Sequence, residues 1–128
     1  MDKLEYIPGD LVKFATNTYT IVNFEENFLY NKICYALIST NSTKTAFVAG
    51  RDILPIPLTP EILEKNGWVK DKEAYINDSY HLHLCGKYDR YSVYKVVNDN
   101  IVWLTDIRNV SDLQHLLFGL GINNEMEV

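Results

Sequence analysis

The residues best suited to chemistry stand in one segment, His81-Leu82-His83-Leu84-Cys85. Residues two apart on a strand share a face, which would place His81, His83 and Cys85 on one side. The two leucines between them would face a core. Imidazole and thiolate groups are ligands that zinc prefers, but a structural zinc site takes four ligands and no fourth stands nearby. We favour a half-exposed strand with its polar side in water and keep the metal site as an alternative.

Tyrosines alternate with charged residues in the next segment, which contains Tyr88, Arg90, Tyr91 and Tyr94. Tyrosines interleaved with basic residues can stack on bases and contact phosphates. Tyrosine and arginine are also enriched at protein interfaces. Ordinary strand alternation, with Tyr91 and Tyr94 on opposite sides, explains the same residues without any partner. If the protein binds a partner, we expect this segment to contribute, with Arg90 as the charged anchor.

A final amphipathic helix is predicted near the end of the chain. Its leucines follow helical spacing, at positions Leu113, Leu116, Leu117 and Leu120. Ser111 and Gln114 form a capping-box pattern before this stripe, and Gly121 ends it. Phe118 lies off the stripe, so either the helix is covered on two sides or Phe118 is exposed to a partner. We favour the covered arrangement and keep Phe118 as a candidate interface residue.

No pattern of nucleophilic catalysis is present. None of the serines stands in a GxSxG turn. A cysteine paired with a histidine is geometrically possible, but two cysteines and three histidines allow such a pair by chance. We therefore expect a protein that is not an enzyme and that needs no cofactor.

Composition and charge limit the classes of partner. The 128 residues have a mass of 14.8 kDa, are 47% hydrophobic and carry a net charge of −5. Nucleic-acid binders usually carry a basic excess, because phosphate neutralisation supplies most of their affinity. The longest apolar run, Tyr35-Ala36-Leu37-Ile38, is far short of a membrane span. We expect a protein partner or self-association, and neither nucleic acid nor membrane.

The expected location is the cytoplasm. Cys34 and Cys85 are far apart in the sequence and form no CxxC motif, which favours two free thiols in a reducing compartment. The first residues show neither the basic nor the apolar region of a signal peptide.

Residues 1–57 read as short strands separated by turns. β-Branched and aromatic residues predict five strands, at residues 11–14, 19–24, 33–38, 46–48 and 53–57. Five short strands in so few residues predict a small SH3-like β-barrel, although a plain antiparallel meander fits the pattern too.

Residues 58–128 predict an α-β-β-β-α unit, with one helix at each end of a sheet of three or four strands, so the chain as a whole is expected to be α+β. Thr59 and Pro60 are typical of a helix start, and Asn66-Gly67 of its end. Strands follow at residues 80–84, 91–97 and 101–104, the last two joined by a tight turn at residues 98–100. Without a Gly- or Ser-rich linker between them, the two halves are expected to pack closely.

Three stretches carry a resemblance to a known family. They are Pro8–Val12, Pro55–Trp68, which ends in the sequence IPLTPEILEKNGW, and Asp112–Val128, which holds the LQHLLFGLGI helix and a short acidic tail. Together they cover about a third of the chain. They resemble a family of small proteins, without an assigned activity, in Bacteroidetes genomes and their phages and prophages. The resemblance implies a bacterial or phage setting and a two-part layout, and it carries over no functional residue.

These observations favour a non-enzymatic accessory protein that acts as a protein-interaction module. Nucleic-acid binding through the barrel or through the tyrosine-containing strand is the first alternative. A metal site at His81, His83 and Cys85 is the second.

Overall fold

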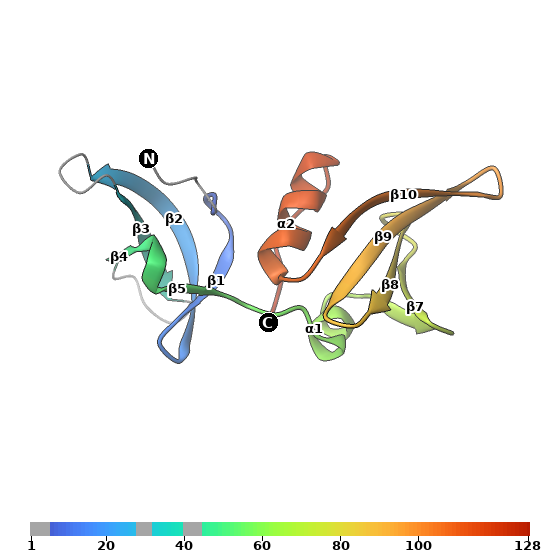
Figure 1. Cartoon of the computed structure of the whole chain (residues 1–128), viewed down its shortest axis with the longest axis horizontal. Coiled ribbons are helices and arrows are strands. Elements are labelled where there is room, and N and C mark those ends of the chain that lie inside the picture. The colour runs from blue at the N-terminus through green and yellow to red at the C-terminus, as the bar shows by residue number, and fades with distance from the viewer. Residues whose placement is uncertain (1–5, 28–31, 40–44) are drawn as a thin grey trace. The chain divides into compact units, whose positions relative to one another are not determined.

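The computed structural model describes residues 6–27, 32–39 and 45–128. The chain divides into two compact units, Met1–Ile56 and Pro57–Val128. Each unit contains one five-stranded antiparallel sheet, and the second also contains two α-helices (Figure 1). The fold is therefore α+β.

The N-terminal unit is a sheet of five strands. These are β1 (Leu11–Phe14), β2 (Asn17–Asn27), β3 (Lys32–Ser39), β4 (Thr45–Ala49) and β5 (Ile53–Pro55), with a 3₁₀ turn at Gly50–Asp52 before β5. The strand order is β4-β3-β2-β1-β5, and β2 carries a bulge between Ile21 and Asn23. All five predicted strands are present. No pairing joins the described residues of β4 and β5, so this part of the chain forms an open sheet and the closed barrel is not seen.

Alternation explains the core of the N-terminal unit. Its buried side chains come from one face of the strands and from the segment before β1, namely Tyr6, Val12, Ile21, Tyr35, Leu37, Val48 and Ile53. The Tyr6 and Tyr35 rings meet edge to face at 5.5 Å.

The C-terminal unit places a sheet between its two helices in sequence. Its elements are α1 (Pro60–Lys65), β6 (Val69–Asp71), β7 (Ala74–Asn77), β8 (Leu82–Lys87), β9 (Arg90–Val97), β10 (Asn100–Ile107) and α2 (Val110–Gly119). The strand order β10-β9-β8-β7-β6 is a simple meander. The expected sheet of three or four strands is too small, because β6 and β7 add two short strands to β8, β9 and β10. They pair across a turn at Lys72, whose φ is 58°.

The predicted start and end of α1 are confirmed. Thr59 is the N-cap, and its Oγ1 accepts a hydrogen bond from the Ile62 N–H at 3.3 Å. Pro60 occupies the first turn, where a missing N–H costs nothing. Gly67 has a φ of +84°, a conformation that favours glycine, and the Trp68 N–H then donates to the Leu63 carbonyl at 3.0 Å.

The cap of α2 differs from the predicted one. Asn109 is the N-cap, and the Asp112 carboxylate accepts hydrogen bonds from the Arg108 and Asn109 N–H groups at 2.9 and 3.0 Å. The N-terminal end of a helix carries a partial positive charge, so the ionised carboxylate of Asp112 is stabilised there more than the neutral amide of Gln114 would be. Ser111 and Gln114, the predicted capping pair, are instead buried within the helix.

Candidate functional site: an exposed aromatic row

The two faces of the C-terminal sheet differ in burial. Tyr75, Leu84 and Val93 lie opposite one another on β7, β8 and β9, and all three are buried. The residues that alternate with them along the strands lie on the opposite face of the sheet, which we call the outer face.

One continuous row of side chains crosses the outer face. Its members are cross-strand partners on all five strands, in the order Val69, Ile76, His83, Tyr94 and Trp103. The chain thus aligns three aromatic rings on β8, β9 and β10. We call these five residues the outer row.

The rings of the outer row are in contact. The His83 and Tyr94 rings are stacked, with their centroids 4.8 Å apart and an angle of 23° between their planes. The Tyr94 and Trp103 rings lie 4.9 Å apart at an angle of 57°. Trp103 is 58% exposed although it is one of the largest apolar side chains in the chain. Rings held by their neighbours and open to water are suited to receive a flat or apolar partner surface.

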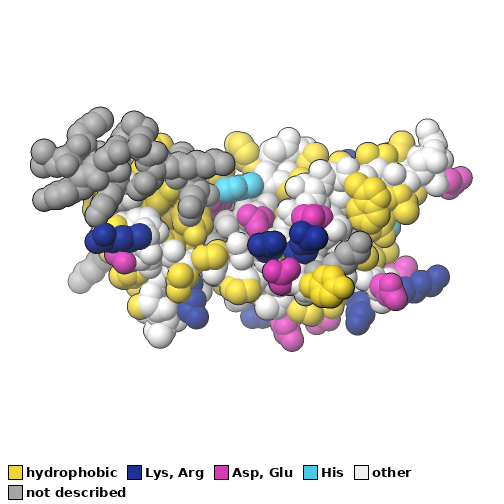
Figure 2. Space-filling view, viewed as in Figure 1, with side chains coloured by type: hydrophobic (Ala, Val, Ile, Leu, Met, Phe, Trp, Pro, Cys, Tyr) yellow, Lys and Arg dark blue, Asp and Glu magenta, His cyan; other side chains and the backbone are white. Residues whose placement is uncertain are grey.

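The hairpin of β9 and β10 extends this apolar surface. Pairing between β8 and β9 ends at Tyr94, so residues 95–102 form a ribbon of two strands only. Apolar side chains on this ribbon are exposed on both of its faces: Val96, Val97, Ile101 and Val102. Figure 2 shows hydrophobic side chains gathered over the region of β9 and β10. We call residues 95–102 the hairpin arm.

A shallow hollow lies beside the outer row. It has a volume of about 500 Å³ and is lined by Asp71, Lys72, Glu73, Ala74, Ile76, His83, Cys85 and Tyr94. Carboxylate, imidazole and thiol groups all reach it. Among residues 6–27, 32–39 and 45–128, however, no three His, Cys, Asp or Glu side chains lie close enough to hold a metal ion.

The structure separates His81 from the other two residues of the candidate metal site. Leu82 and Leu84 are fully buried, whereas His83 and Cys85 are half-buried on the other face, as alternation predicted. His81 lies in the turn before β8 with a φ of 56° and does not extend the strand. The His83 ring is stacked on Tyr94.

The three candidate tyrosines do not form one surface. Tyr88 occupies the turn between β8 and β9, is fully exposed and has a φ of 51°. Tyr91 lies on the buried face, 6.5 Å from the Tyr75 ring. Burial, and then the neighbouring Tyr75 and Glu61, raise the pKa of the Tyr91 hydroxyl. Only Tyr94 belongs to the outer row.

Phe118 is 65% exposed, so the expected covering of α2 on a second side is not seen at this residue. Leu113 and Leu117 of the same helix are buried. A single exposed aromatic residue of this kind is ordinary on a protein surface.

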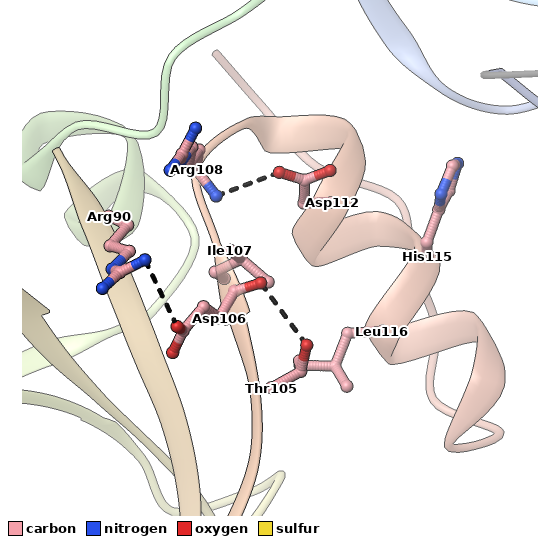
Figure 3. Close-up of a pocket in the computed structure, with 8 residues that line it drawn as sticks. All are labelled: Arg90, Thr105, Asp106, Ile107, Arg108, Asp112, His115 and Leu116. Carbon is pink, nitrogen blue, oxygen red and sulfur yellow. Dashed lines mark hydrogen bonds and ion pairs between the residues drawn. The ribbon is translucent and has the colours of Figure 1, made fainter.

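A second hollow of about 540 Å³ lies where β10 leads into α2 (Figure 3). Arg90 pairs with Asp106 at 3.8 Å, and the Ser92 hydroxyl donates to the same carboxylate at 2.7 Å. Basic and acidic side chains alternate over this region (Figure 2). The Arg90 guanidinium predicted to anchor a partner is thus already engaged with a carboxylate of its own sheet, and exposed pairs of this kind contribute little to stability.

Sequence reasoning missed Trp103 and the apolar residues of the hairpin arm. The signal was present in the run Ile101-Val102-Trp103-Leu104. Four successive apolar residues on a strand must place apolar side chains on both faces. Such a strand is either buried on both sides or leaves apolar side chains in water, and only the strand order distinguishes the two.

Comparison with known proteins adds no relative. No protein-family model, curated protein or solved structure matches the chain. Within the part of the chain that the structure describes, no helix has both the length and the apolar character required to cross a bilayer.

Proposed function

We propose that the chain is a non-enzymatic accessory protein of a bacterium or phage that acts in the cytoplasm as a protein-interaction module. The outer face of the C-terminal sheet is its contact surface. The observation that carries this proposal is the outer row, in which His83, Tyr94 and Trp103 stand side by side on an open face.

The chemistry of this face favours a protein partner. Aromatic side chains contribute much contact area and lose little conformational freedom when they are covered, which suits the centre of an interface. The surrounding charges are mixed: Asp71, Lys72 and Glu73 border the adjacent hollow. A polar rim around an apolar centre is the usual arrangement of protein interfaces.

Nucleic-acid binding is the second candidate, because aromatic rings on an open sheet can stack on bases. The charge on the outer face opposes it. Arg90 is paired with Asp106, and the C-terminal residues 58–128 contain seven Lys and Arg against eleven Asp and Glu. A surface of this kind gains little from the release of counterions.

The test compares an outer-row variant with a matched control. Tyr94→Ala removes the central ring of the row, and Phe47→Ala removes an exposed ring from β4 in the other unit. Proteins captured from the encoding organism by the wild type and by Phe47→Ala, but not by Tyr94→Ala, are candidate partners. The purified partner should then bind in calorimetry with the same dependence on Tyr94.

Two further results decide between the candidates. Binding that is lost on Phe47→Ala and kept on Tyr94→Ala would refute the outer face as the contact surface. Binding of single-stranded oligonucleotides that weakens steeply as salt rises would favour the nucleic-acid candidate instead.

The N-terminal unit is proposed to belong to the SH3-like class. Two features support this: β5 returns to pair with β1, and a 3₁₀ turn separates β4 from β5. Membership of the Bacteroidetes and phage family likewise stays a proposal, which rests on the three resembling stretches alone.

A further inference from the structure

We propose that two copies of this chain pair through β10, antiparallel and about a two-fold axis, with Val102 opposite Val102 of the second copy. The pairing uses the edge of the sheet, whereas the proposed function uses its outer face. The two ideas can therefore fail separately.

The backbone of β10 is open on one side. β10 is the last strand in the order β10-β9-β8-β7-β6, and among the strands that the structure describes it pairs only with β9. Asn98 and Asp99 both have positive φ, at 51° and 66°, which identifies a two-residue turn closed by the pair Val97 and Asn100.

The tight turn fixes which backbone groups face outward. Pairs alternate along an antiparallel ladder, so Asn100 and Val102 bond to β9, whereas the N–H and C=O groups of Ile101 and Trp103 point away from it. These two residues offer four backbone groups to another strand.

The half of β10 next to the turn is unprotected. Proteins usually guard an exposed edge with lysine, proline, an inward charge, a β-bulge or a very short strand. The bulge of β10, at Leu104, and its one charged residue, Asp106, both lie beyond Trp103, whereas Ile101, Val102 and Trp103 carry none of these features. The opposite edge strand, β6, is only three residues long and contains Lys70 and Asp71. The two edges of one sheet are therefore built differently, and β10 is the one suited to pairing.

The strand is complementary to itself in one register. When Val102 lies opposite Val102 of the second copy, Ile101 of each copy lies opposite Trp103 of the other. All outward groups of these two residues are then matched in four N–H···O bonds. Across the interface the aromatic Trp103 faces the β-branched Ile101, which is a favourable cross-strand pair, and Val102 faces Val102. Asp99 lies in the turn and Asp106 lies beyond the bulge of β10, so neither carboxylate falls within the paired segment 101–103.

This pairing also completes the hairpin arm. A ribbon of two strands is marginally stable in water, and three or more strands with an apolar face are needed for stability. Two paired arms form four strands, and the outer row continues from Trp103 to Ile101 of the second copy. The contact involves few residues, so we expect a weak dimer with a dissociation constant in the micromolar range or above.

Sedimentation equilibrium of the full chain is the first test. The average mass should rise from 14.8 kDa toward twice that value as the concentration increases into the millimolar range. Val102→Lys places two lysines opposite each other and should keep the chain monomeric. Leu54→Lys, at a 55% exposed site on β5, an edge strand of the other sheet, should leave association unchanged. Thermal melting should show that both variants are folded.

Cross-linking tests the register even if Val102→Lys impairs folding. In a chain in which Cys34 and Cys85 are replaced by serine, Val102→Cys should form a disulfide-linked dimer on mild oxidation. The two residues 102 would form a non-hydrogen-bonded pair, in which the Cα atoms lie about 4.5 Å apart. This distance is within the range that a disulfide spans. Ile101→Cys alone and Val69→Cys alone should cross-link far less. A mixture of Ile101→Cys with Trp103→Cys should cross-link.

Three results would overturn the proposal. The first is a mass that stays at 14.8 kDa throughout. The second is a dimer that survives Val102→Lys, which would place the contact elsewhere. The third is cross-linking no stronger at Val102 than at Val69. A monomer whose capture of a partner still depends on Tyr94 would refute the edge pairing and leave the proposed function intact.

Discussion

The Tyr94 ring lies 4.9 Å from the Trp103 ring on the neighbouring strand, and its other side is stacked on His83 at 4.8 Å. Trp103 is therefore held by a neighbour while most of its surface faces water. Contacts along the row fix the ring orientation before any partner arrives, which lowers the entropy lost on binding.

Contact between Tyr94 and Trp103 should appear in a double-mutant cycle. We expect Tyr94→Ala and Trp103→Ala to interact by about 0.5 to 1.5 kcal/mol in unfolding free energy, because paired aromatic rings contribute that much beyond area burial. Urea unfolding followed by circular dichroism measures the four corners of the cycle.

The control cycle combines Trp103→Ala with Phe47→Ala, whose side chain lies in the other unit. This pair should be additive within about 0.5 kcal/mol. A coupling as large in the control as in the row would contradict the contact.

The C-terminal tail should depend on Asn66. Its side-chain amide donates to the Glu127 carbonyl at 2.7 Å, and its oxygen accepts from the Glu127 N–H at 2.9 Å, as a strand residue would. Asn66→Ala removes both bonds, together with the one that the same amide donates to the Ile62 carbonyl at 2.7 Å, and should cost at least about 1 kcal/mol, with faster hydrogen exchange at Glu127. Asn123→Ala, which removes a hydrogen bond within the tail, should leave the exchange of Glu127 unchanged. Equal exchange rates in the wild type and Asn66→Ala would refute the attachment.

Local signals explain which elements could be predicted. Thr59, Pro60 and Gly67 each act within a few residues, so the ends of α1 follow from the sequence alone. Two overlapping capping patterns preceded α2, and the sequence alone did not indicate that Asp112 would accept two backbone hydrogen bonds. Strand order is not local, which is why the five-stranded sheet was underestimated.

The site was harder to predict for the same reason. Tyr94 was a candidate, but its neighbours His83 and Trp103 belong to other strands, and only the register brings the three rings together. The sequence grouped Tyr94 with Tyr88 and Tyr91 because they are close along the chain. Alternation then places Tyr91 on the opposite face.

A core substitution in α1 should lower the unfolding free energy more than a substitution of its N-cap. Leu63 is fully buried, and Leu63→Ala should lower the unfolding free energy by about 2 to 5 kcal/mol. Thr59→Ala removes only the cap bond and should cost about 1 kcal/mol. Both tryptophans, Trp68 and Trp103, lie in the C-terminal unit, so fluorescence during urea unfolding reports on this unit. Leu54→Ala, at an exposed site in the other unit, is the control and should change this signal little. A Leu63→Ala loss no larger than that of Thr59→Ala would contradict the burial of Leu63.

Stability at high pH should depend on Tyr91. Burial is the largest cause that raises the pKa of its hydroxyl above the ordinary value of 10.0, followed by Tyr75 and Glu61. Above pH 10 the unfolded chain therefore releases this proton before the folded chain does. The stability contributed by the neutral hydroxyl is complete below the unfolded pKa and is lost as the pH rises through the folded pKa.

Tyr91→Phe removes the titrating group, so its unfolding free energy should fall less steeply between pH 9 and 11 than that of the wild type. Tyr88→Phe, at a fully exposed site, should follow the wild-type slope. Urea unfolding across this pH range measures the slopes, and equal slopes for wild type and Tyr91→Phe would refute the raised pKa.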